Sequence, residues 1–208
     1  MVMVKVKICG ITNLEDALLS VEAGADALGF NFYPLSPRYI TPEDARRIIA
    51  ELPPSTFCVG VFVNEESPGA VARLAARSGV GAVQLHGDES PEYCAALGEQ
   101  RVIKALRVGK DFVPEGAARY RAESILLDAF GASARGGTGE TFDWALARKT
   151  REVVAQLYLA GGLTPENIAE AIAAVSPYAV DVCSGVELAP GRKDMARVRA
   201  FISAVRAW

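Results

Sequence analysis

The sequence has 208 residues, of which half are hydrophobic and 23% are charged, so it predicts a folded core and excludes extensive disorder. The net charge of −3 gives no general attraction to nucleic acid or to an anionic membrane, and no apolar run reaches the ~18 residues of a membrane span. Four scattered cysteines form no Cys-x-x-Cys pair, which is typical of free thiols in a reducing cytoplasm, where we expect the protein to be located. With His86 as the only histidine, a histidine-rich metal site is excluded and no metal is expected.

Short apolar runs rich in valine, isoleucine and leucine recur along the whole chain, and helical patterns follow them. The predicted strands are Val2–Cys9, Ala25–Phe32, Phe57–Val63, Ala82–Leu85, Arg101–Leu106, Ser124–Asp128, Gln156–Ala160 and Ala179–Cys183. Runs that are apolar throughout suit parallel strands buried on both faces, and eight strand-plus-helix units favour a closed barrel over an open sheet. No linker or break in composition divides the chain. We therefore expect an α/β protein, a single-domain (β/α)₈ TIM barrel over residues 1–208.

The predicted helices are Leu14–Ala23, Pro42–Glu51, Pro68–Ser78, Pro91–Leu97, Asp143–Glu152, Pro165–Val175 and Met195–Arg206. Three of them begin alike, at Thr41-Pro42-Glu43, Ser90-Pro91-Glu92 and Thr164-Pro165-Glu166. In each, a hydroxyl is expected to cap the helix and proline to take its first position, which explains the pattern without any catalytic role. Proline and glycine interrupt Lys110–Arg121, so a short or distorted helix is expected there.

Three glycine-rich stretches each follow a predicted strand: Gly136–Gly139, Ala160–Leu163 and Ser184–Glu187. Glycine lets backbone N–H groups approach an anion, and barrels often hold a phosphate with the loops after their last two strands. We therefore predict a phosphate site formed by Gly137, Gly139, Gly161, Gly162, Ser184 and Gly185.

The candidate proton-transfer groups are Cys9 and Asp128, which end the first and sixth predicted strands at the face where barrel active sites are built. Lys7 shares a strand face with Cys9, and its ammonium would favour the thiolate. Asp181, in the neighbouring last strand, is expected to pair with Lys7. Each residue also has a purely structural interpretation: a small buried thiol, a helix-capping carboxylate and a buried ion pair.

Two further residues lie in connections on the same face. Arg38, beside Tyr33 and Tyr39 in a long loop, is suited to bind the carboxylate of a flat substrate, or it is a solvated loop arginine. His86 closes the fourth predicted strand as a ligand-facing hydrogen-bond donor or as a plain loop residue.

Motifs from the first strand to the last resemble the phosphoribosylanthranilate isomerase family. They are Lys7-Ile8-Cys9-Gly10-Ile11-Thr12, Ser36-Pro37-Arg38-Tyr39-Ile40, Gln84-Leu85-His86-Gly87, Leu127-Asp128, Gly136-Gly137-Thr138-Gly139 with Thr141-Phe142-Asp143-Trp144, Ala160-Gly161-Gly162-Leu163, and Asp181-Val182-Cys183-Ser184-Gly185-Val186-Glu187. The resemblance implies an aldose–ketose isomerase that needs no cofactor. It would convert N-(5-phosphoribosyl)anthranilate into 1-(2-carboxyphenylamino)-1-deoxyribulose 5-phosphate in tryptophan biosynthesis.

Carried over by motif, Cys9 resembles the general base, Asp128 the general acid and Arg38 the residue that binds the anthranilate carboxylate, with His86 and Asp181 expected to contact substrate. The chain departs from the family pattern at Cys183, where a small hydroxyl residue is familiar, and the change is interpreted as neutral. The resemblance leaves a homodimer open, since heat-loving members of the family form one. A metal-dependent epimerase, an indole-forming synthase and a non-catalytic phosphosugar-binding barrel are the alternatives.

Overall fold

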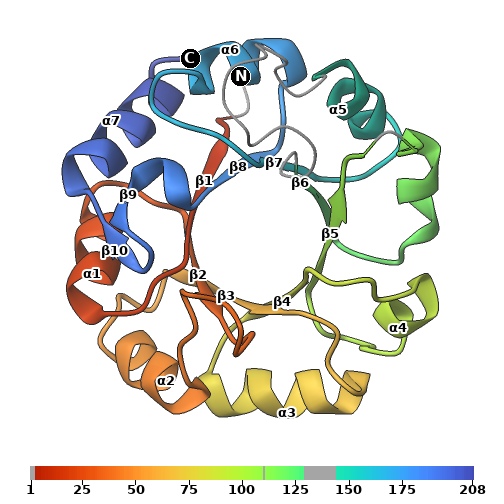
Figure 1. Cartoon of the computed structure of the whole chain (residues 1–208), viewed down its shortest axis with the longest axis horizontal. Coiled ribbons are helices and arrows are strands. Elements are labelled where there is room, and N and C mark those ends of the chain that lie inside the picture. The colour runs from red at the N-terminus through yellow and green to blue at the C-terminus, as the bar shows by residue number, and fades with distance from the viewer. Residues whose placement is uncertain (1–2, 110, 129–143) are drawn as a thin grey trace.

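Eight parallel strands close into a barrel in chain order, and helices surround it (Figure 1). The computed structural model describes residues 3–109, 111–128 and 144–208. The strands are β1 Lys5–Cys9, β2 Ala27–Asn31, β3 Phe57–Phe62, β4 Ala82–Leu85, β5 Val102–Arg107, β6 Ser124–Asp128, β7 Leu157–Ala160 and β8 Ala179–Val182. The expected (β/α)₈ barrel is therefore confirmed, with strand boundaries close to those predicted.

The register between β1 and β8 closes the barrel and sets the geometry of the site. Lys7 lies opposite Asp181 and Ile8 lies opposite Val182, so the next positions, Cys9 and Cys183, leave neighbouring strands at the same end of the barrel. Because side chains alternate along a strand, Lys7 and Cys9 share the lumenal face, as the sequence predicted.

The helices are α1 Leu14–Glu22, α2 Pro42–Ala50, α3 Pro68–Ser78, α4 Pro91–Ala95, α5 Trp144–Arg151, α6 Ile168–Val175 and α7 Met195–Arg206. Between β5 and β6 the described residues form a 3₁₀ helix, Pro114–Arg119, in agreement with the short or distorted helix expected there. The hydroxyls of Thr41 and Ser90 cap α2 and α4 as predicted. None of the helices in these described segments is long and apolar enough to cross a membrane.

The predicted start of α6 is wrong. The helix begins at Ile168 and not at Pro165, because the side chain of Asn167 accepts a hydrogen bond from the backbone N–H of Thr164 and donates one to the carbonyl of Gly162. These bonds hold residues 165–167 as a separate turn between the glycine-rich loop and the helix.

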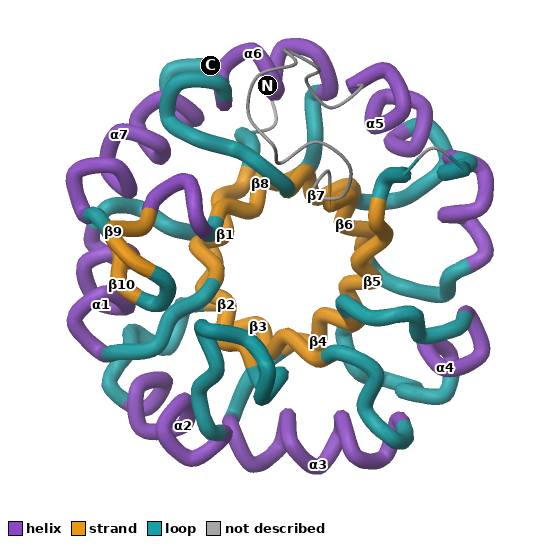
Figure 2. Tube along the Cα trace, viewed as in Figure 1, coloured by secondary structure: helices purple, strands orange, loops and turns teal. Residues whose placement is uncertain are grey.

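A short hairpin after β8 was not predicted. The 3₁₀ helix η2, Ser184–Val186, leads into β9, Glu187–Ala189, which pairs with β10, Arg192–Lys193. The tube in Figure 2 shows this hairpin outside the barrel, beside β1 and α1. It returns the chain to the mouth of the barrel and brings two charged residues, Glu187 and Lys193, next to β1.

Burial divides the strand residues into two apolar sets. Outward-facing residues such as Ile8, Phe30 and Leu127 pack under the helices, while Val59, Ile103, Leu126 and their neighbours fill the lumen. All of these side chains are essentially inaccessible. Each such side chain contributes roughly 1.5–3 kcal/mol relative to exposure, and the filled lumen supports the polar groups at the strand ends.

Candidate active site

The cavity at the carboxyl-terminal end of the barrel has a volume of about 310 Å³ and gathers residues from widely separated parts of the sequence. All of the predicted site residues that the structure describes line it: Cys9, Arg38, His86, Asp128, Gly161, Gly162, Asp181, Ser184 and Gly185. Gly137 and Gly139 lie outside the described residues. A second cavity, of about 460 Å³, lies at the opposite end and is lined by the strand starts, where barrels do not place catalytic groups.

Lys7 and Asp181 form the predicted ion pair at the base of the cavity. Nζ of Lys7 lies 3.0 Å from Oδ1 of Asp181, and the lysine side chain is fully buried. Burial alone would lower the pKa of Lys7, but the charges of Asp181 and Cys9 together raise it above its ordinary value. Burial raises the pKa of Asp181 to about 6, although Lys7 opposes that shift. The pair therefore keeps a permanent cation directly below Cys9.

Cys9 ends β1, and its pKa lies well below the ordinary value of a thiol. The largest cause is a hydrogen bond from the thiol of Cys183, and the charges of Lys7 and Lys193 add to it while burial opposes. The pKa of Cys183 is raised, first by its hydrogen bond with Cys9 and then by burial, and its thiol also donates to Oε1 of Glu187 at 3.7 Å. The sequence predicted the effect of Lys7, whereas Cys183, which it interpreted as a neutral change, is the largest cause of the lowered pKa of Cys9. These partners favour the thiolate, the form in which a cysteine can act as a base.

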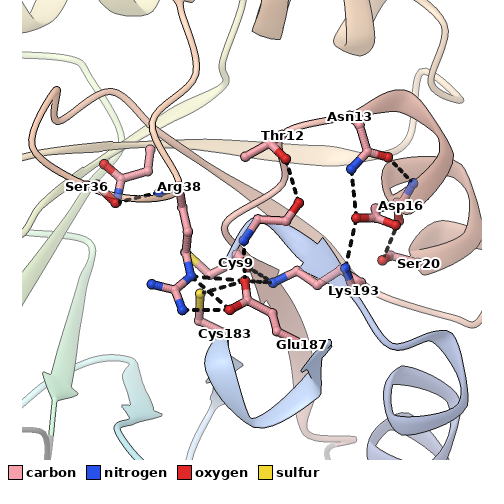
Figure 3. Close-up of polar contacts among 12 residues, drawn as sticks. Cys9, Thr12, Asn13, Asp16, Ser20, Ser36, Arg38, Cys183, Glu187 and Lys193 are labelled. Atoms are coloured by element: carbon pink, nitrogen blue, oxygen red, sulfur yellow. Dashed lines mark hydrogen bonds and ion pairs between the residues drawn. The ribbon is translucent and has the colours of Figure 1, made fainter. Parts of the chain in front are cut away.

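A network of charged groups surrounds Cys9 and fixes Arg38 (Figure 3). Nε of Arg38 lies 3.0 Å from each carboxylate oxygen of Glu187, and Nη2 lies 2.6 Å from Oε2. Lys193 donates from Nζ to the same carboxylate, at 2.8 Å from Oε1, and to the backbone carbonyl of Cys9. Asp16 accepts the backbone N–H of Lys193 at 2.9 Å, which holds the hairpin against α1.

Arg38 is therefore held by an ion pair and is not a solvated loop arginine. Its backbone N–H also donates to Oγ of Ser36, which fixes the long loop after β2. Within the described residues, Nη1 of Arg38 donates no hydrogen bond. One edge of the guanidinium group therefore remains available to an anion in the cavity. Glu187 is the last residue of the Asp181–Glu187 motif, but the sequence analysis assigned it no role. Lys193 was missed because the hairpin that brings it to the site was not predicted.

On the opposite side of the cavity, Asp128 ends β6 beside the β4 residues. Nε2 of His86 lies 3.0 Å from Oδ2 of Asp128, and Nε2 of Gln84 lies 2.9 Å from Nδ1 of His86. Gln84 is 1% exposed and lines the cavity. The sequence left open whether His86 faces a ligand, and the structure places it on the cavity wall as the partner of Asp128.

The loop that carries His86 rests on a buried ion pair that was not predicted. Nζ of Lys104, on β5, lies 2.7 Å from Oε2 of Glu89 and donates to the carbonyls of Leu85 and Gly87. The carboxylate of Glu89 in turn accepts the backbone N–H of Gly87. Both charged side chains are 1–2% exposed, so the loop after β4 is held by charge-assisted bonds on both sides of His86.

The remaining wall is formed by the glycine-rich turns after β7 and β8. Gly161 and Gly162 have φ values of 84° and 65°, a conformation that side chains other than glycine rarely adopt. A Cβ at Gly185 would lie 1.9 Å from the carbonyl oxygen of Leu163, so only glycine lets the two turns approach. The N–H groups of Gly162, Ser184 and Gly185 donate no backbone hydrogen bond within the described part of the chain. They form a concave set of donors suited to a phosphate.

Comparisons with known proteins agree with this geometry. The sequence model that describes N-(5'-phosphoribosyl)anthranilate (PRA) isomerase matches residues 6–204. The N-(5'-phosphoribosyl)anthranilate isomerase of Trichlorobacter lovleyi is 57% identical over 200 residues, which cover 96% of this chain and 97% of the relative.

Two solved structures extend the likeness to the fold. A phosphoribosyl anthranilate isomerase in complex with reduced 1-(o-carboxyphenylamino)-1-deoxyribulose 5-phosphate has a TM-score of 0.88 at 52% identity, over 99% of this chain and 100% of the other. Monomers generated from the dimeric isomerase of Thermotoga maritima give a TM-score of 0.88 at 49% identity, with the same coverage. A match over nearly the whole chain, at more than half identity to a relative, means that the chain belongs to the phosphoribosylanthranilate isomerase family.

Proposed function

We propose that Cys9 and Asp128 carry out the two proton transfers of the reaction that this family catalyses. As a member of the family, the chain is an isomerase of tryptophan biosynthesis that converts N-(5-phosphoribosyl)anthranilate into 1-(2-carboxyphenylamino)-1-deoxyribulose 5-phosphate. Family membership removes the epimerase, the indole-forming synthase and the non-catalytic barrel from consideration. The observation that carries the proposal is that Cys9 and Asp128 end β1 and β6 and line one cavity, where the charges of Lys7 and Lys193 lower the pKa of the thiol.

The reaction begins with ring opening. Asp128, carrying a proton, donates it to the furanose ring oxygen as the bond between that oxygen and carbon 1 breaks, and the electron pair of the amine nitrogen forms a Schiff base. The Cys9 thiolate then removes the proton from carbon 2, which gives an enolamine. Tautomerisation of the enolamine produces the ketone. Each group contributes roughly 10²–10⁴-fold when it is in place and in the right protonation state.

Three further contacts orient the substrate in this proposal. The free edge of Arg38, next to the Glu187 pair, binds the anthranilate carboxylate. The N–H groups around Gly161, Gly162, Ser184 and Gly185 bind the phosphate, together with Gly137 and Gly139, which remain predictions from the sequence. A related isomerase at 52% identity was solved with a compound that carries both a carboxylate and a phosphate, which supports a site with one contact for each group.

Asp181 has an indirect part in this proposal. Its carboxylate faces the cavity, but its hydrogen bond goes to Lys7. It keeps the buried ammonium charged, and the ammonium in turn favours the Cys9 thiolate. The reaction as written needs neither a metal nor an organic cofactor, and both proton transfers are assigned to residues of this chain.

The test of the proposal is the loss of substrate fluorescence in Cys9→Ala and Asp128→Asn. Each substitution is expected to lower kcat by at least ~10²-fold while substrate affinity is retained. Cys58→Ala is the matched thiol control, because Cys58 is buried in β3 away from the cavity and burial raises its pKa to about 11. Near-normal turnover in Cys9→Ala would contradict the assignment of the base.

We also propose that the chain forms a homodimer that works in the cytoplasm. The support is the likeness to the dimeric isomerase of Thermotoga maritima at 49% identity. Light scattering on the purified protein should give twice the chain mass of 22.1 kDa. A mass of one chain at micromolar concentration would contradict the dimer and leave the catalytic assignments intact.

A further inference from the structure

Gln84 forms the inner end of a row of three side chains that leads to Asp128. Its Nε2 lies 2.9 Å from Nδ1 of His86, and Nε2 of His86 lies 3.0 Å from Oδ2 of Asp128. The glutamine side chain is buried and faces the cavity, yet its Oε1 has no hydrogen-bond partner among the described residues. A buried amide oxygen without a partner is costly, so the position calls for an explanation.

The chemistry of the row depends on which way the amide faces. With Nε2 toward the ring, Nδ1 of His86 must accept, so the neutral ring carries its proton on Nε2 and donates it to Asp128. That arrangement suits an ionised carboxylate. With the amide turned by half a rotation, Oε1 accepts from a protonated Nδ1, and Nε2 of His86 accepts from a protonated carboxyl. Only the second arrangement suits Asp128 as an acid.

The surroundings allow both arrangements. Among the described residues Oε1 of Gln84 bonds to nothing else, so turning the amide exchanges one hydrogen bond to His86 for another. The main chain on either side of His86 is fixed by Lys104 and Glu89, which leaves the ring in place while its protons change. The ring is 24% exposed, which lets it exchange protons with solvent between turnovers.

We propose that Gln84 is a positioning residue for the acid: its amide serves either neutral tautomer of His86, so Asp128 keeps its place with or without a proton. The inference rests on the proposed role of Asp128. Conversion from the carboxylate to the acid form takes up one proton from solvent. In that conversion the imidazole loses its Nε2 proton and gains one on Nδ1. In the chemical step the O–H bond of Asp128 breaks and its proton goes to the ring oxygen.

Other charged groups border this row and belong in any account of its pH dependence. The cavity wall adds Cys9 from β1, Arg38 from the loop after β2 and Asp181 from β8, while Arg107 lies opposite Asp128 on β5. The Lys7–Asp181 pair lies at the foot of the cavity. Because these groups also affect Cys9, the pH dependence of activity does not report on Gln84, His86 and Asp128 alone. The protonation of His86 has to be measured directly.

The chain offers that readout because His86 is its only histidine. In protein labelled with ¹⁵N-histidine, a long-range proton–nitrogen NMR spectrum reports a single ring and distinguishes both neutral tautomers from the imidazolium. For the substrate-free native protein we expect the Nε2–H pattern at high pH and a population of the Nδ1–H pattern as Asp128 takes up its proton. An Nε2–H pattern that passes directly to the imidazolium would overturn the proposal.

The matching variant is Gln84→Met, which keeps the length of the side chain and removes both hydrogen-bonding groups. The Nδ1–H pattern should disappear, kcat/KM should fall roughly tenfold to a hundredfold, and the alkaline limb of its pH profile should move to lower pH. Gln156→Met is the control, because the side chain of Gln156 accepts a hydrogen bond from Ser124 at the start of the strands, far from His86 and Asp128. An Nδ1–H pattern that persists in Gln84→Met would overturn the proposal, and so would an unchanged alkaline limb.

The two proposals fail in distinguishable ways. If Asp128→Asn retains full turnover, the assignment of the acid fails, whatever the NMR spectra show. If Asp128→Asn is inactive while His86 never carries its proton on Nδ1, Asp128 remains assigned as the acid and the proposed role of Gln84 is wrong. If Gln84→Met does not fold, the pH series on the native protein decides the question alone.

Discussion

Cys9, at the end of β1, is surrounded by charged side chains, whereas Asp128, at the end of β6, contacts an imidazole and, through it, an amide. These two environments match the different requirements of a base and an acid. A base must hold a negative charge, which the ammonium groups of Lys7 and Lys193 stabilise. An acid must keep its proton until it transfers the proton to the ring oxygen. The His86 ring permits this, because its nitrogen can either donate a hydrogen bond to Asp128 or accept one from it. One cavity thus contains two electrostatic environments.

The largest effect is expected from the removal of Lys7, which supports the charged environment of Cys9. Lys7→Met leaves Asp181 buried without its partner, so the free energy of unfolding should fall by about 3 kcal/mol in urea titrations. The pKa of Cys9 should rise, since Lys7 lowers it, and the acid limb of kcat/KM should move to higher pH. Arg47→Met, at an exposed pair with Asp44, should change neither quantity. An unmoved acid limb would contradict the role of Lys7.

Lys104→Met tests the other side of the cavity with the same substitution. Glu89 would lose its buried partner, and stability should again fall by about 3 kcal/mol. Because Lys104 is not among the groups that lower the pKa of Cys9, the acid limb should stay in place while kcat falls through displacement of His86. A shift of the acid limb in this variant, equal to that in Lys7→Met, would remove the distinction between the two sides.

The two regions differ in how much of them the sequence reveals. The strand-end positions of Cys9 and Asp128 were predicted, and the lumenal position of Asp181 with its pairing to Lys7 followed from alternation along parallel strands. Arg38 and the glycine turns were found by residue type and spacing.

The supporting residues were missed because their partners are distant in the sequence. Arg38 bonds Glu187 across 149 positions, and Lys193 bonds the Cys9 carbonyl across 184. Such contacts depend on the closure of the barrel and on a hairpin that no periodicity signalled. Gln84 was visible in a motif, but its bond to His86 depends on side-chain rotamers that a sequence does not specify.

Glu187→Gln should have an intermediate effect on the charged side. Arg38 would lose its bidentate anchor, and Lys193 would lose one of its two acceptors. We expect KM to rise roughly tenfold, with a smaller change in kcat, because the guanidinium group of Arg38 would then bind the substrate carboxylate from a less fixed position. Steady-state kinetics would check this. A fall in kcat with KM unchanged would show that Glu187 acts on the chemistry and not on the placement of Arg38.

Cys183→Ala should have the smallest effect on stability and on turnover at alkaline pH, although it should move the acid limb. It removes the hydrogen bond that contributes most to the low pKa of Cys9, so that pKa should rise toward ~8.5 and the acid limb should move to higher pH. Cys183→Ser keeps a donor and should move it less. Turnover above that limb should be unchanged in both variants. The rate of Cys9 alkylation as a function of pH provides the measurement, and an identical profile in all three proteins would contradict the contribution of Cys183.

The most direct test of the central claim is a crystal structure of this chain with reduced 1-(o-carboxyphenylamino)-1-deoxyribulose 5-phosphate bound. We predict the Cys9 sulfur at roughly 3–3.5 Å from carbon 2 of the sugar, the carboxyl group of Asp128 on the other side of the chain of carbons, and the phosphate against Gly162 and Gly185. A ligand bound with its sugar carbons out of reach of either Cys9 or Asp128 would contradict the account.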